Sequence, residues 1–568
     1  MKVLLINTVC GQGSTGKICV AIAEILKSQG HQVCIAYNGE EGTSFSPVFK
    51  IAGKWTRRFC HYFWYKLIGT SRYEAILPTL RLLGWVKRYN PDVIHLHNIH
   101  GGYLNYPLLF RFLKKFKKPV VWTLHDVWPI TGFCPYFTVA QCDKWKTGCS
   151  KCSLAKKVGS KLGLDWSEAD YKLKKKLFTA IDDLTLVPVS EWLAGLVRES
   201  FLHDAKINVI YNGIDTSVFR PINLNIKEEL KIQSKFLIVG VATTWDDRKG
   251  LNDYVRLREL LNDDYVIILV GLSPNQIAEL PEGIMGFERT QTITDLIRIY
   301  GSADVLLSLS KAETFGLTMA EAMACGTPVV VYDNTAHPEV VREGCGYVVQ
   351  TGNLLGVKES IELIRSKGKS TYSKRCIEVS KEIYDDNKNF GKYISLYINV
   401  LQGGGKIALG VASSWNYTKG LNDYYKLAEK ENRLYLLVLV GLSESQIKDL
   451  PRNIIGLGKI SSVQDLAFLY SLASVVTSLS YSETFGLTIA ESLSCGTPVI
   501  VYDNTAQPYI INEETGIAVK SGNIEGVDCA IKQILSGDFK QEMCRSRAET
   551  KFDISLNFNK YVKLYDSL

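Results

Sequence analysis

Short runs of consecutive apolar residues recur along the whole chain, and stretches with apolar positions at helical spacing separate them. Such runs are typical of strands buried on both faces of a parallel sheet, with the helices as crossovers. In the N-terminal 200 residues they predict strands at 2–7, 32–37, 92–97, 119–125 and 184–190. The pattern therefore predicts a doubly wound α/β domain.

The second half of the sequence contains one unit twice. Residues 240–357 align without a gap onto 410–527, and 60 of the 118 aligned positions are identical. A period this long indicates a duplicated domain and not a solenoid repeat. In the first copy, apolar runs predict strands at 236–242, 265–272, 304–310 and 328–333. Both copies are therefore predicted to be Rossmann-type α/β domains.

Three domains follow from these patterns. We predict an N-terminal Rossmann-like domain at 1–210, a first Rossmann-like C-domain (copy 1) at 211–401 and its duplicate (copy 2) at 406–568. The residues QGGG at 402–405 suit a flexible join. Ligands of doubly wound sheets bind at the carboxyl ends of the strands, where the motifs described next also lie.

A glycine-rich loop follows the first predicted strand and precedes a helix. It contains Gly13, Ser14, Thr15 and Gly16 and matches the G-x-G-x-x-G dinucleotide fingerprint. It also resembles a P-loop, but Ile18 stands where a magnesium-binding hydroxyl is needed. All these interpretations share a close approach of the backbone to an anion at a helix N-terminus. A purely structural tight turn is the alternative.

Two glutamates eight positions apart carry the strongest signal in copy 1. Glu313 is predicted in a loop at the end of a strand, and Glu321 one turn into the helix that follows. The backbone N–H groups of Gly316, Leu317 and Thr318 would point between them, which suits a diphosphate. The alternative is a solvated helix face with a capping carboxylate.

The chain contains the E-x7-E motif, the G-x-P-V that follows it, Arg248-Lys249-Gly250 and the GSTG loop. Together these motifs resemble the group 1 (family 4) retaining glycosyltransferases of GT-B fold. The resemblance covers residues 1–400, and the repeat adds a second C-domain. The segments IHLHNIHGGYLNYPLL and LHDVWPITGFC particularly resemble the bacterial surface-polysaccharide members.

The resemblance implies a role for each matching residue. Arg248 and Lys249 would neutralise the departing nucleotide diphosphate, Glu313 would hold hydroxyls of the donor sugar, and Glu321 would bind the ribose. His125 would lie near the reacting sugar on the N-domain side. The loop from Gly13 to Gly16 would shape the acceptor and phosphate side of the cleft.

The implied reaction transfers a sugar, with retention, from a UDP- or GDP-linked donor to a lipid-linked or growing polysaccharide acceptor. It would need no cofactor for catalysis, because fixed cations and a helix N-terminus can stabilise the leaving charge. Two alternatives stay open. One is a noncatalytic or regulatory nucleotide-binding protein, and the other is a GT-B epimerase or phosphorylase.

The two copies differ at one position of the motif. Copy 2 keeps Lys419, Glu483 and Glu491 but has Thr418 where copy 1 has Arg248. A lysine alone lacks the forked geometry with which arginine binds a diphosphate. We therefore expect copy 1 to work with the N-domain, and copy 2 to be a silent, regulatory or alternative half.

Histidines and cysteines form two further clusters in the N-domain. His97 ends the predicted strand at 92–97, and His100 follows it. They could hold a metal ion, bind acceptor hydroxyls or phosphate, or simply line the cleft. The loop 134–152 contains four cysteines within 19 residues, which predicts a structural zinc site near His125. Redox-active pairs, disulfides and free thiols are the alternatives. The four positions are Cys134, Cys142, Cys149 and Cys152.

Composition and the apolar runs indicate the class of protein and its expected location in the cell. Apolar residues make up 46% and charged residues 22%, which is usual for globular proteins and excludes a disordered chain. No run reaches the ~18–20 apolar residues of a membrane span, and the N-terminus does not read as a signal peptide, so we expect a cytoplasmic protein.

Residues 1–200 hold 28 Lys and Arg against 14 Asp and Glu, which suggests an anionic partner. Basic and aromatic residues mix at 57–69 and 110–119, as in segments that lie on the inner face of a membrane. Helices that pack these aromatics inward are the alternative. No motif supports nucleic-acid binding.

Overall fold

The structure is a computed structural model, and it describes residues 1–38, 45–154, 160–401, 406–430, 434–451, 453–460, 462–537 and 539–558. The predicted join at 402–405 lies outside the described residues. The chain divides into two compact units, which contain residues 4–23 with 34–391, and residues 1–3 and 24–33 with 392–568. The predicted domain boundaries stay a prediction.

The N-terminal sheet has seven strands in the order β3-β2-β1-β4-β5-β6-β7. All five predicted strands are present, and the short edge strands β3 and β7 are additional. The central residues of the five predicted strands are buried, as the continuous apolar runs require. The strands are β1 (Lys2–Asn7), β2 (Gln32–Tyr37), β3 (Val48–Lys50), β4 (Val93–Leu96), β5 (Val120–Leu124), β6 (Leu184–Pro188) and β7 (Lys206–Ile207).

Helices connect these strands. The first, α1 (Gly13–Ser28), begins directly in the glycine-rich loop. The last, α8 (Glu191–Glu199), begins at Ser190, whose side chain accepts a hydrogen bond from the Leu193 N–H. The others are α2 (Lys54–Cys60), the π-helix η1 (His61–Ile68), α3 (Ile76–Tyr89), α4 (Tyr106–Phe116), α5 (Lys144–Thr147) and α7 (Ser167–Phe178).

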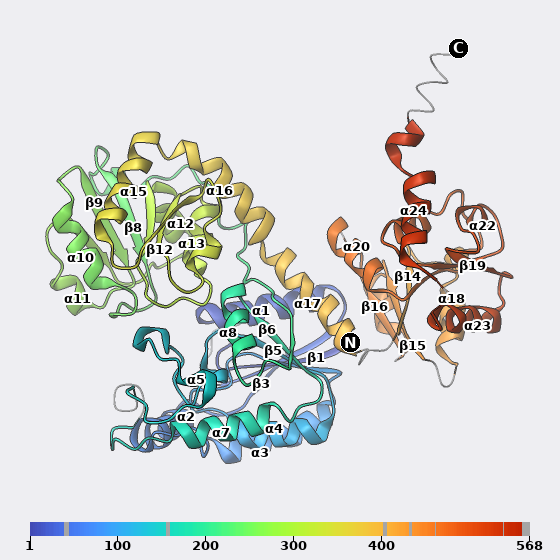
Figure 1. The fold of residues 1–568 in the computed structure, drawn as a ribbon, viewed down its shortest axis with the longest axis horizontal. Helices are drawn as coiled ribbons and strands as arrows, with labels where there is room; N and C mark the ends of the chain where they lie inside the picture. The colour runs from blue at the N-terminus through green and yellow to red at the C-terminus, as the bar shows by residue number, and fades with distance from the viewer. Residues whose placement is uncertain are drawn as a thin grey trace, which may run out of the picture. The chain divides into compact units, whose positions relative to one another are not determined.

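Copy 1 forms a six-stranded parallel sheet in the order β10-β9-β8-β11-β12-β13. Helices α10 and α15 contact each other on one face, and α12, α13 and α16 cover the other (Figure 1). The strands are β8 (Phe236–Val241), β9 (Tyr265–Val270), β10 (Ile284–Phe287), β11 (Val305–Ser308), β12 (Val329–Tyr332) and β13 (Gly346–Val349). The helices are α9 (Ile226–Glu229), α10 (Leu251–Leu260), α11 (Pro274–Ala278), α12 (Ile293–Ser302), α13 (Leu317–Ala324), α14 (His337–Val340), α15 (Leu354–Lys367), α16 (Ser370–Ile383) and α17 (Asp386–Leu401).

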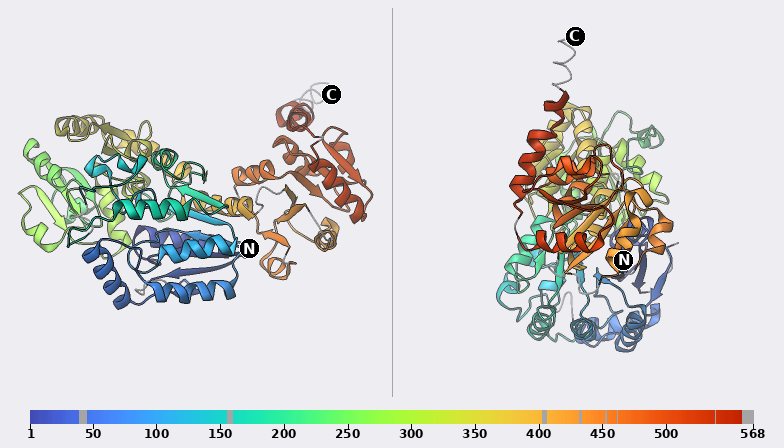
Figure 2. Two further views of the ribbon diagram at one scale, coloured as in Figure 1. Left: turned by 60° about the horizontal axis from the view of Figure 1, so that its bottom comes forward. Right: turned by 90° about the vertical axis from the view of Figure 1, so that its right-hand side faces the viewer.

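Copy 2 repeats this topology in the order β16-β15-β14-β17-β18-β19, and its pairs are again parallel (orange and red in Figure 2). Its strands are β14 (Lys406–Val411), β15 (Tyr435–Val440), β16 (Ile454–Leu457), β17 (Val475–Ser478), β18 (Val499–Tyr502) and β19 (Gly516–Val519). Its helices are α18 (Leu421–Ala428), α19 (Glu444–Asp449), α20 (Val463–Leu472), α21 (Leu487–Ser494), α22 (Gln507–Ile510), α23 (Ile524–Leu535) and α24 (Gln541–Lys551).

A close backbone contact in each copy requires a glycine. Gly250 precedes α10 with φ +76°, and a Cβ there would lie 2.2 Å from the Leu309 carbonyl oxygen. The equivalent Gly420 has φ +73°, and its Cβ would lie 2.0 Å from the Leu479 oxygen. Only glycine combines this dihedral with so close an approach. The contact holds the start of the helix against the loop that contains Glu313.

We predict that Gly250→Ala lowers the free energy of unfolding by about 2–3 kcal/mol, because alanine adds both backbone strain and a clash. Urea unfolding followed by circular dichroism measures the change. Gly301→Ala is the matched control, since Gly301 lies in α12 and a Cβ there meets nothing within 4 Å. If the two variants are equally stable, the contact with Leu309 does not constrain the turn.

Candidate active site

A partly buried ion pair joins two loops at the carboxyl edge of the copy 1 sheet. Lys249, in the loop after β8, pairs through Nζ with a carboxylate oxygen of Glu313, in the loop after β11. The N–H of Glu313 donates to the Thr335 hydroxyl at 3.0 Å, which adds the loop after β12. Burial alone would raise the pKa of Glu313, but Lys249, His337 and Arg248 together lower it. The carboxylate is therefore ionised.

Arg248 lies next to this pair. Its guanidinium carbon is 4.2 Å from the centre of the Tyr136 ring, a cation–π contact with the cysteine-rich loop of the N-domain. Its carbonyl oxygen accepts a hydrogen bond from the Lys311 N–H at 2.7 Å. The structure thus brings together Arg248, Lys249 and Glu313 as the motif predicts, whereas nothing in the sequence pointed to Tyr136.

A cleft of about 450 Å³ lies between the glycine-rich loop and α13. Gly13 and Ser14 line one side, together with Lys17 from the first turns of α1. Leu317, Thr318 and Glu321 line the other side. Two helix N-termini thus open onto one cleft, an arrangement that favours anions.

Other predicted residues of these loops do not line the cleft. Gly16 is buried below it, where a Cβ would lie 3.1 Å from Val9 Cγ2. Neither Thr15 nor Gly316 lines it, although Gly316 precedes α13 with φ +97°. Lys17 and Arg289 do line it and were missed by the sequence analysis, although Lys17 directly follows the glycine motif.

Glu321 has an unusual environment for a carboxylate. One of its oxygens accepts a hydrogen bond from the Tyr300 hydroxyl at 2.8 Å. Burial raises the pKa of Glu321 to about 7, although the Tyr300 hydrogen bond and the charge of Lys17 act to lower it. Around neutral pH the group is therefore divided between its acid and carboxylate forms.

Histidines from the ends of β4 and β5 form hydrogen-bonded pairs. His97 Nδ1 lies 3.0 Å from His125 Nε2, and burial lowers the pKa of His125 to about 4 against the opposing charge of Asp126. His100 Nε2 lies 2.8 Å from a carboxylate oxygen of Asp126, a residue that the sequence analysis missed. The Thr314 hydroxyl donates to the His125 carbonyl oxygen at 2.8 Å. This bond brings the histidine segment next to Glu313.

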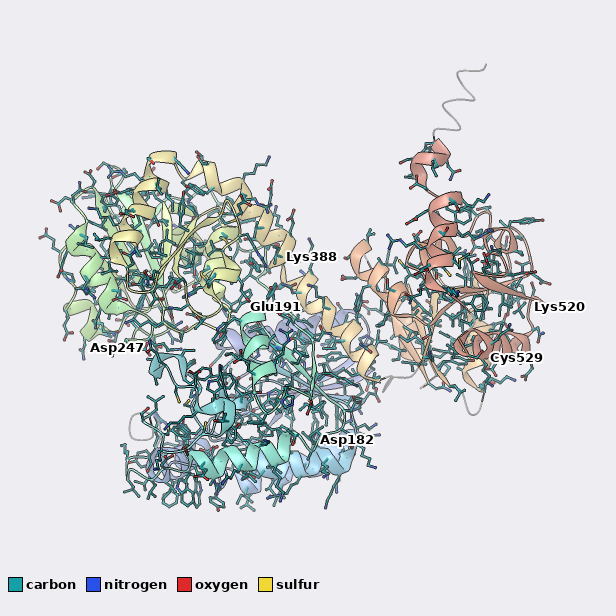
Figure 3. All side chains as sticks on the ribbon, viewed as in Figure 1. Asp182, Glu191, Asp247, Lys388, Lys520 and Cys529 are labelled. Atoms are coloured by element: carbon teal, nitrogen blue, oxygen red, sulfur yellow. The ribbon has the colours of Figure 1, made fainter. Side chains whose placement is uncertain are left out.

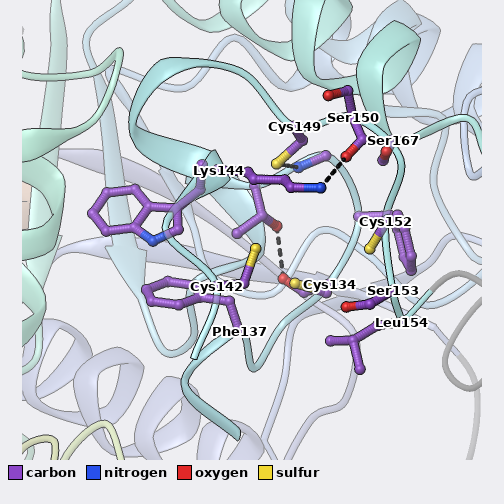
Figure 4. A pocket seen from close by; sticks show the side chains of 14 residues that line it. Cys134, Phe137, Cys142, Lys144, Cys149, Ser150, Cys152, Ser153, Leu154 and Ser167 are labelled. Atoms are coloured by element: carbon purple, nitrogen blue, oxygen red, sulfur yellow. Dashed lines mark hydrogen bonds between the residues drawn. The ribbon is translucent and has the colours of Figure 1, made fainter. Parts of the chain in front are cut away.

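The four cysteines of the loop 134–152 line one small pocket, and their side chains reach it from different parts of the loop (Figure 4). The Gly132 N–H donates to Cys149 Sγ at 3.2 Å. Among the residues that the structure describes, however, no three His, Cys, Asp or Glu side chains are arranged to hold a metal ion. The structure therefore does not support the predicted zinc site, because sharing a pocket wall does not bring sulfur atoms to ligand geometry.

The second-copy residues form the same pairs in their own domain. Lys419 pairs with Glu483, and the Tyr470 hydroxyl donates to Glu491 at 2.8 Å. Both copies therefore form the same lysine–glutamate pair and the same tyrosine–glutamate hydrogen bond.

Family models match most of the described chain. The model for glycosyl transferases group 1 matches residues 223–382 and again 400–551, and the model for glycosyltransferase family 4 matches residues 15–218. The chain belongs to the group 1 glycosyltransferases. Both matches to the first model fall on the duplicated C-domains, which supports the predicted duplication.

Curated relatives and solved structures agree with this assignment. The colanic acid biosynthesis glycosyl transferase WcaC of Escherichia coli K12 is 26% identical over 324 residues, which cover 55% of this chain and 77% of WcaC. A D-inositol 3-phosphate glycosyltransferase of Mycobacterium sp. (strain KMS) is 28% identical over 193 residues, which cover 31% of this chain and 44% of that protein.

Two solved structures share the fold. Anabaena Alr3699/HepE in complex with UDP has a TM-score of 0.51 at 15% identity and covers 70% of this chain and 100% of HepE. Sucrose-phosphate synthase from Thermosynechococcus elongatus has a TM-score of 0.53 at 16% identity and covers 71% of this chain and 100% of the synthase. With its three parallel Rossmann-like sheets, this glycosyltransferase has the predicted GT-B fold with a second C-domain.

We predict that Glu321→Gln removes a pH-dependent loss of stability. Because folding raises the pKa of Glu321 above its usual 4.5 to about 7, the acid form stabilises the fold, and this contribution is lost as the pH rises through 7. The thermal unfolding midpoint of wild type should therefore fall between about pH 5 and pH 8 more steeply than that of the variant. Glu491→Gln, at an exposed position of copy 2, is the control and should leave the wild-type slope. Equal slopes for all three proteins would contradict the prediction.

Proposed function

We propose that the N-domain and copy 1 transfer a sugar, with retention, from a UDP- or GDP-linked donor to a lipid-linked or growing polysaccharide acceptor. The observation that carries the proposal is the cluster of Arg248, Lys249 and Glu313, which joins the loop after β8 to the loop that leads into α13. Copy 1 is the active copy in this proposal, because it has both cations.

The chemistry of the transfer suits these groups. Breaking the glycosidic bond leaves negative charge on the nucleotide diphosphate, and preorganised cations in a poorly hydrated site stabilise such charge strongly. Arg248 and Lys249 supply two positive charges, and the N–H groups that begin α13 supply a helix N-terminus. We propose that these groups act without a metal ion, that Glu313 holds sugar hydroxyls, and that Glu321 binds the ribose.

On the N-domain side, we propose that the loop from Gly13 to Gly16 shapes the phosphate and acceptor side of the cleft. His125 would lie near the reacting sugar, with His97 and His100 toward the acceptor. The bond from Thr314 to the His125 carbonyl supports this, since it joins the histidine segment to the Glu313 loop.

Two comparisons support the substrate classes. The name of WcaC assigns it to the biosynthesis of colanic acid, and HepE was crystallised with UDP. We propose a polysaccharide-type acceptor and a nucleotide donor for this chain on that basis. A noncatalytic nucleotide-binding role, or epimerase or phosphorylase activity, remains as the rival proposal.

Two experiments test the function. The first is calorimetric titration with UDP and with GDP, and the second is a transfer assay on bacterial membrane lipids with labelled nucleotide sugars. We expect labelled sugar in the lipid fraction. Its anomeric configuration should be kept, and the transfer should also occur with EDTA present. Nucleotide binding without any transfer would favour the noncatalytic alternative. A sugar product formed without an acceptor would favour the epimerase or phosphorylase.

We predict that Lys249→Ala and Arg248→Ala each lower kcat about 10²–10³-fold, the usual effect of removing one group that stabilises transition-state charge. Initial rates of sugar transfer measure the effect. Lys374→Ala is the control, because the Lys374 side chain is 89% exposed on α16. Rates within twofold of wild type for both active-site variants would remove the cation cluster from the mechanism.

We further propose that the protein docks on the inner face of the cytoplasmic membrane through α2 and η1. Trp55, Phe59 and Tyr62 lie at helical spacing and are 80%, 68% and 54% exposed. Lys161 Nζ lies 5.0 Å from the centre of the Tyr62 ring, which places a positive charge beside the aromatics. In the other predicted stretch, 110–119, the aromatic residues pack inward: Phe110 is buried in the core, and Phe112 and Phe116 pack against it. None of the described helices is long and apolar enough to cross a membrane.

We predict that the double variant Trp55→Ser/Phe59→Ser loses most of its binding to vesicles that contain anionic phospholipid. Each substitution removes a large apolar side chain from the docking face. Co-sedimentation with the vesicles measures bound protein. Leu355→Ser, which changes a residue that is 62% exposed on α15, should bind as wild type does. Unchanged sedimentation of the double variant would locate membrane binding elsewhere or exclude it.

A further inference from the structure

Copy 2 keeps most of the residues with which copy 1 lines the cleft. Twelve residues line the cleft from the copy 1 sheet and its loops, and eight of them recur unchanged 170 positions later. The recurring residues include Gly441, Thr488 and Glu491. Arg289 is replaced by another cation, Lys459. Copy 2 is therefore conserved on the surface that would face a donor.

The local geometry is also the same. The hydroxyls of Tyr470 and Tyr300 both donate to their glutamates at 2.8 Å. The N–H of Glu483 donates to the Thr505 hydroxyl at 3.0 Å, the same distance as the corresponding bond of Glu313. The ion pair of Lys419 with Glu483 is retained as well. These contacts hold the copy 2 loops in the arrangement found in copy 1.

One difference falls at the joint with the N-domain. In copy 1, the Glu339 carboxylate accepts hydrogen bonds from the N–H groups of Glu191 and Trp192, at 3.1 and 3.0 Å, and so caps α8. Glu191 lies at the end of α8 that faces copy 1 (Figure 3). Copy 2 has Tyr509 at this position, 84% exposed, and a phenol cannot replace the two carboxylate oxygens. Copy 2 thus keeps ligand-facing residues and lacks the residue that attaches copy 1 to the N-domain.

We infer that copy 2 is a second binding site for a ribonucleoside diphosphate, which holds the nucleotide of a donor without transferring its sugar. The inference rests on the proposed function of copy 1. Glu491 would accept hydrogen bonds from the ribose hydroxyls. Lys419, Lys459 and the N-terminus of α21 would face the diphosphate. Because Thr418 replaces the arginine, this site should bind the nucleotide roughly 10- to 100-fold more weakly than copy 1.

Calorimetric titration of the full chain with UDP and with GDP tests this inference. We predict two sites of unequal affinity for one of these nucleotides. Lys419→Ala/Glu491→Ala should remove only the weaker site, and the matched variant Lys249→Ala/Glu321→Ala should remove only the stronger one. Lys520→Ala, an exposed residue of the same copy (Figure 3), should keep both sites, because its counterpart in copy 1 does not line the cleft.

A single site that the copy 1 variant removes and the copy 2 variant leaves intact would overturn the inference and leave the proposed function standing. Binding of neither nucleotide would overturn both. If a double variant fails to fold, photo-cross-linking of unmodified protein with 5-azido-UDP decides. Labelled peptides from 406–558 support the inference, and labels confined to peptides of copy 1 and the N-domain overturn it.

Discussion

Taking a lysine and a glutamate out of water costs several kcal/mol for each ion unless charges and hydrogen bonds offset it. The edge of the copy 1 sheet is organised around such a pair, Lys249 with Glu313. The positive charge of Arg248 also favours the ionised glutamate, and the Thr335 hydroxyl accepts a hydrogen bond from its backbone N–H. Since these groups come from the loops after three strands, the partly buried pair and the hydrogen bond to Thr335 together hold all three loops. Because α13 begins shortly after Glu313, these contacts also fix the position of its N-terminus.

Directional polar contacts join copy 1 to the N-domain within their common unit. The Thr314 hydroxyl reaches the His125 carbonyl, and the Glu339 carboxylate caps the N-terminus of α8. A carboxylate at a helix N-terminus gains from the dipole and from two N–H donors. The aromatic ring of Tyr136 over Arg248 adds a third link beside the cation cluster. These links help two domains to form one cleft.

Copy 1 both forms the internal contacts of the site and attaches to the N-domain, whereas copy 2 keeps only the internal contacts. The loops of copy 2 still form the lysine–glutamate pair and the tyrosine–glutamate hydrogen bond. The position that caps α8 in copy 1 has become an exposed tyrosine. Internal contacts of a domain depend only on its own residues, so they can persist after a domain loses the residues that attach it to another. This explains why the motif alone does not tell which copy works with the N-domain.

The sequence by itself determined the elements, the duplication and the family motif, because apolar runs, helical spacing and required glycines are local properties. The five N-terminal strands and the helix from Leu317 were predicted in this way. Glycines such as Gly250 mark their turns because no other residue accepts the dihedral and the close contact. The ion pair of Lys249 and Glu313 could be expected only through the family motif, since the two residues lie 64 positions apart.

Tertiary structure decided which side chains meet. Three features depend on how loops from separate domains approach each other. They are the contact of Tyr136 with Arg248, the place of Lys17 in the cleft and the raised pKa of Glu321. It also decided which of two similar basic and aromatic stretches is exposed, because spacing marks a helix face but not what covers it. Four cysteines close in sequence predicted a zinc site, yet ligand geometry depends on distances between sulfur atoms, which only the folded loop sets.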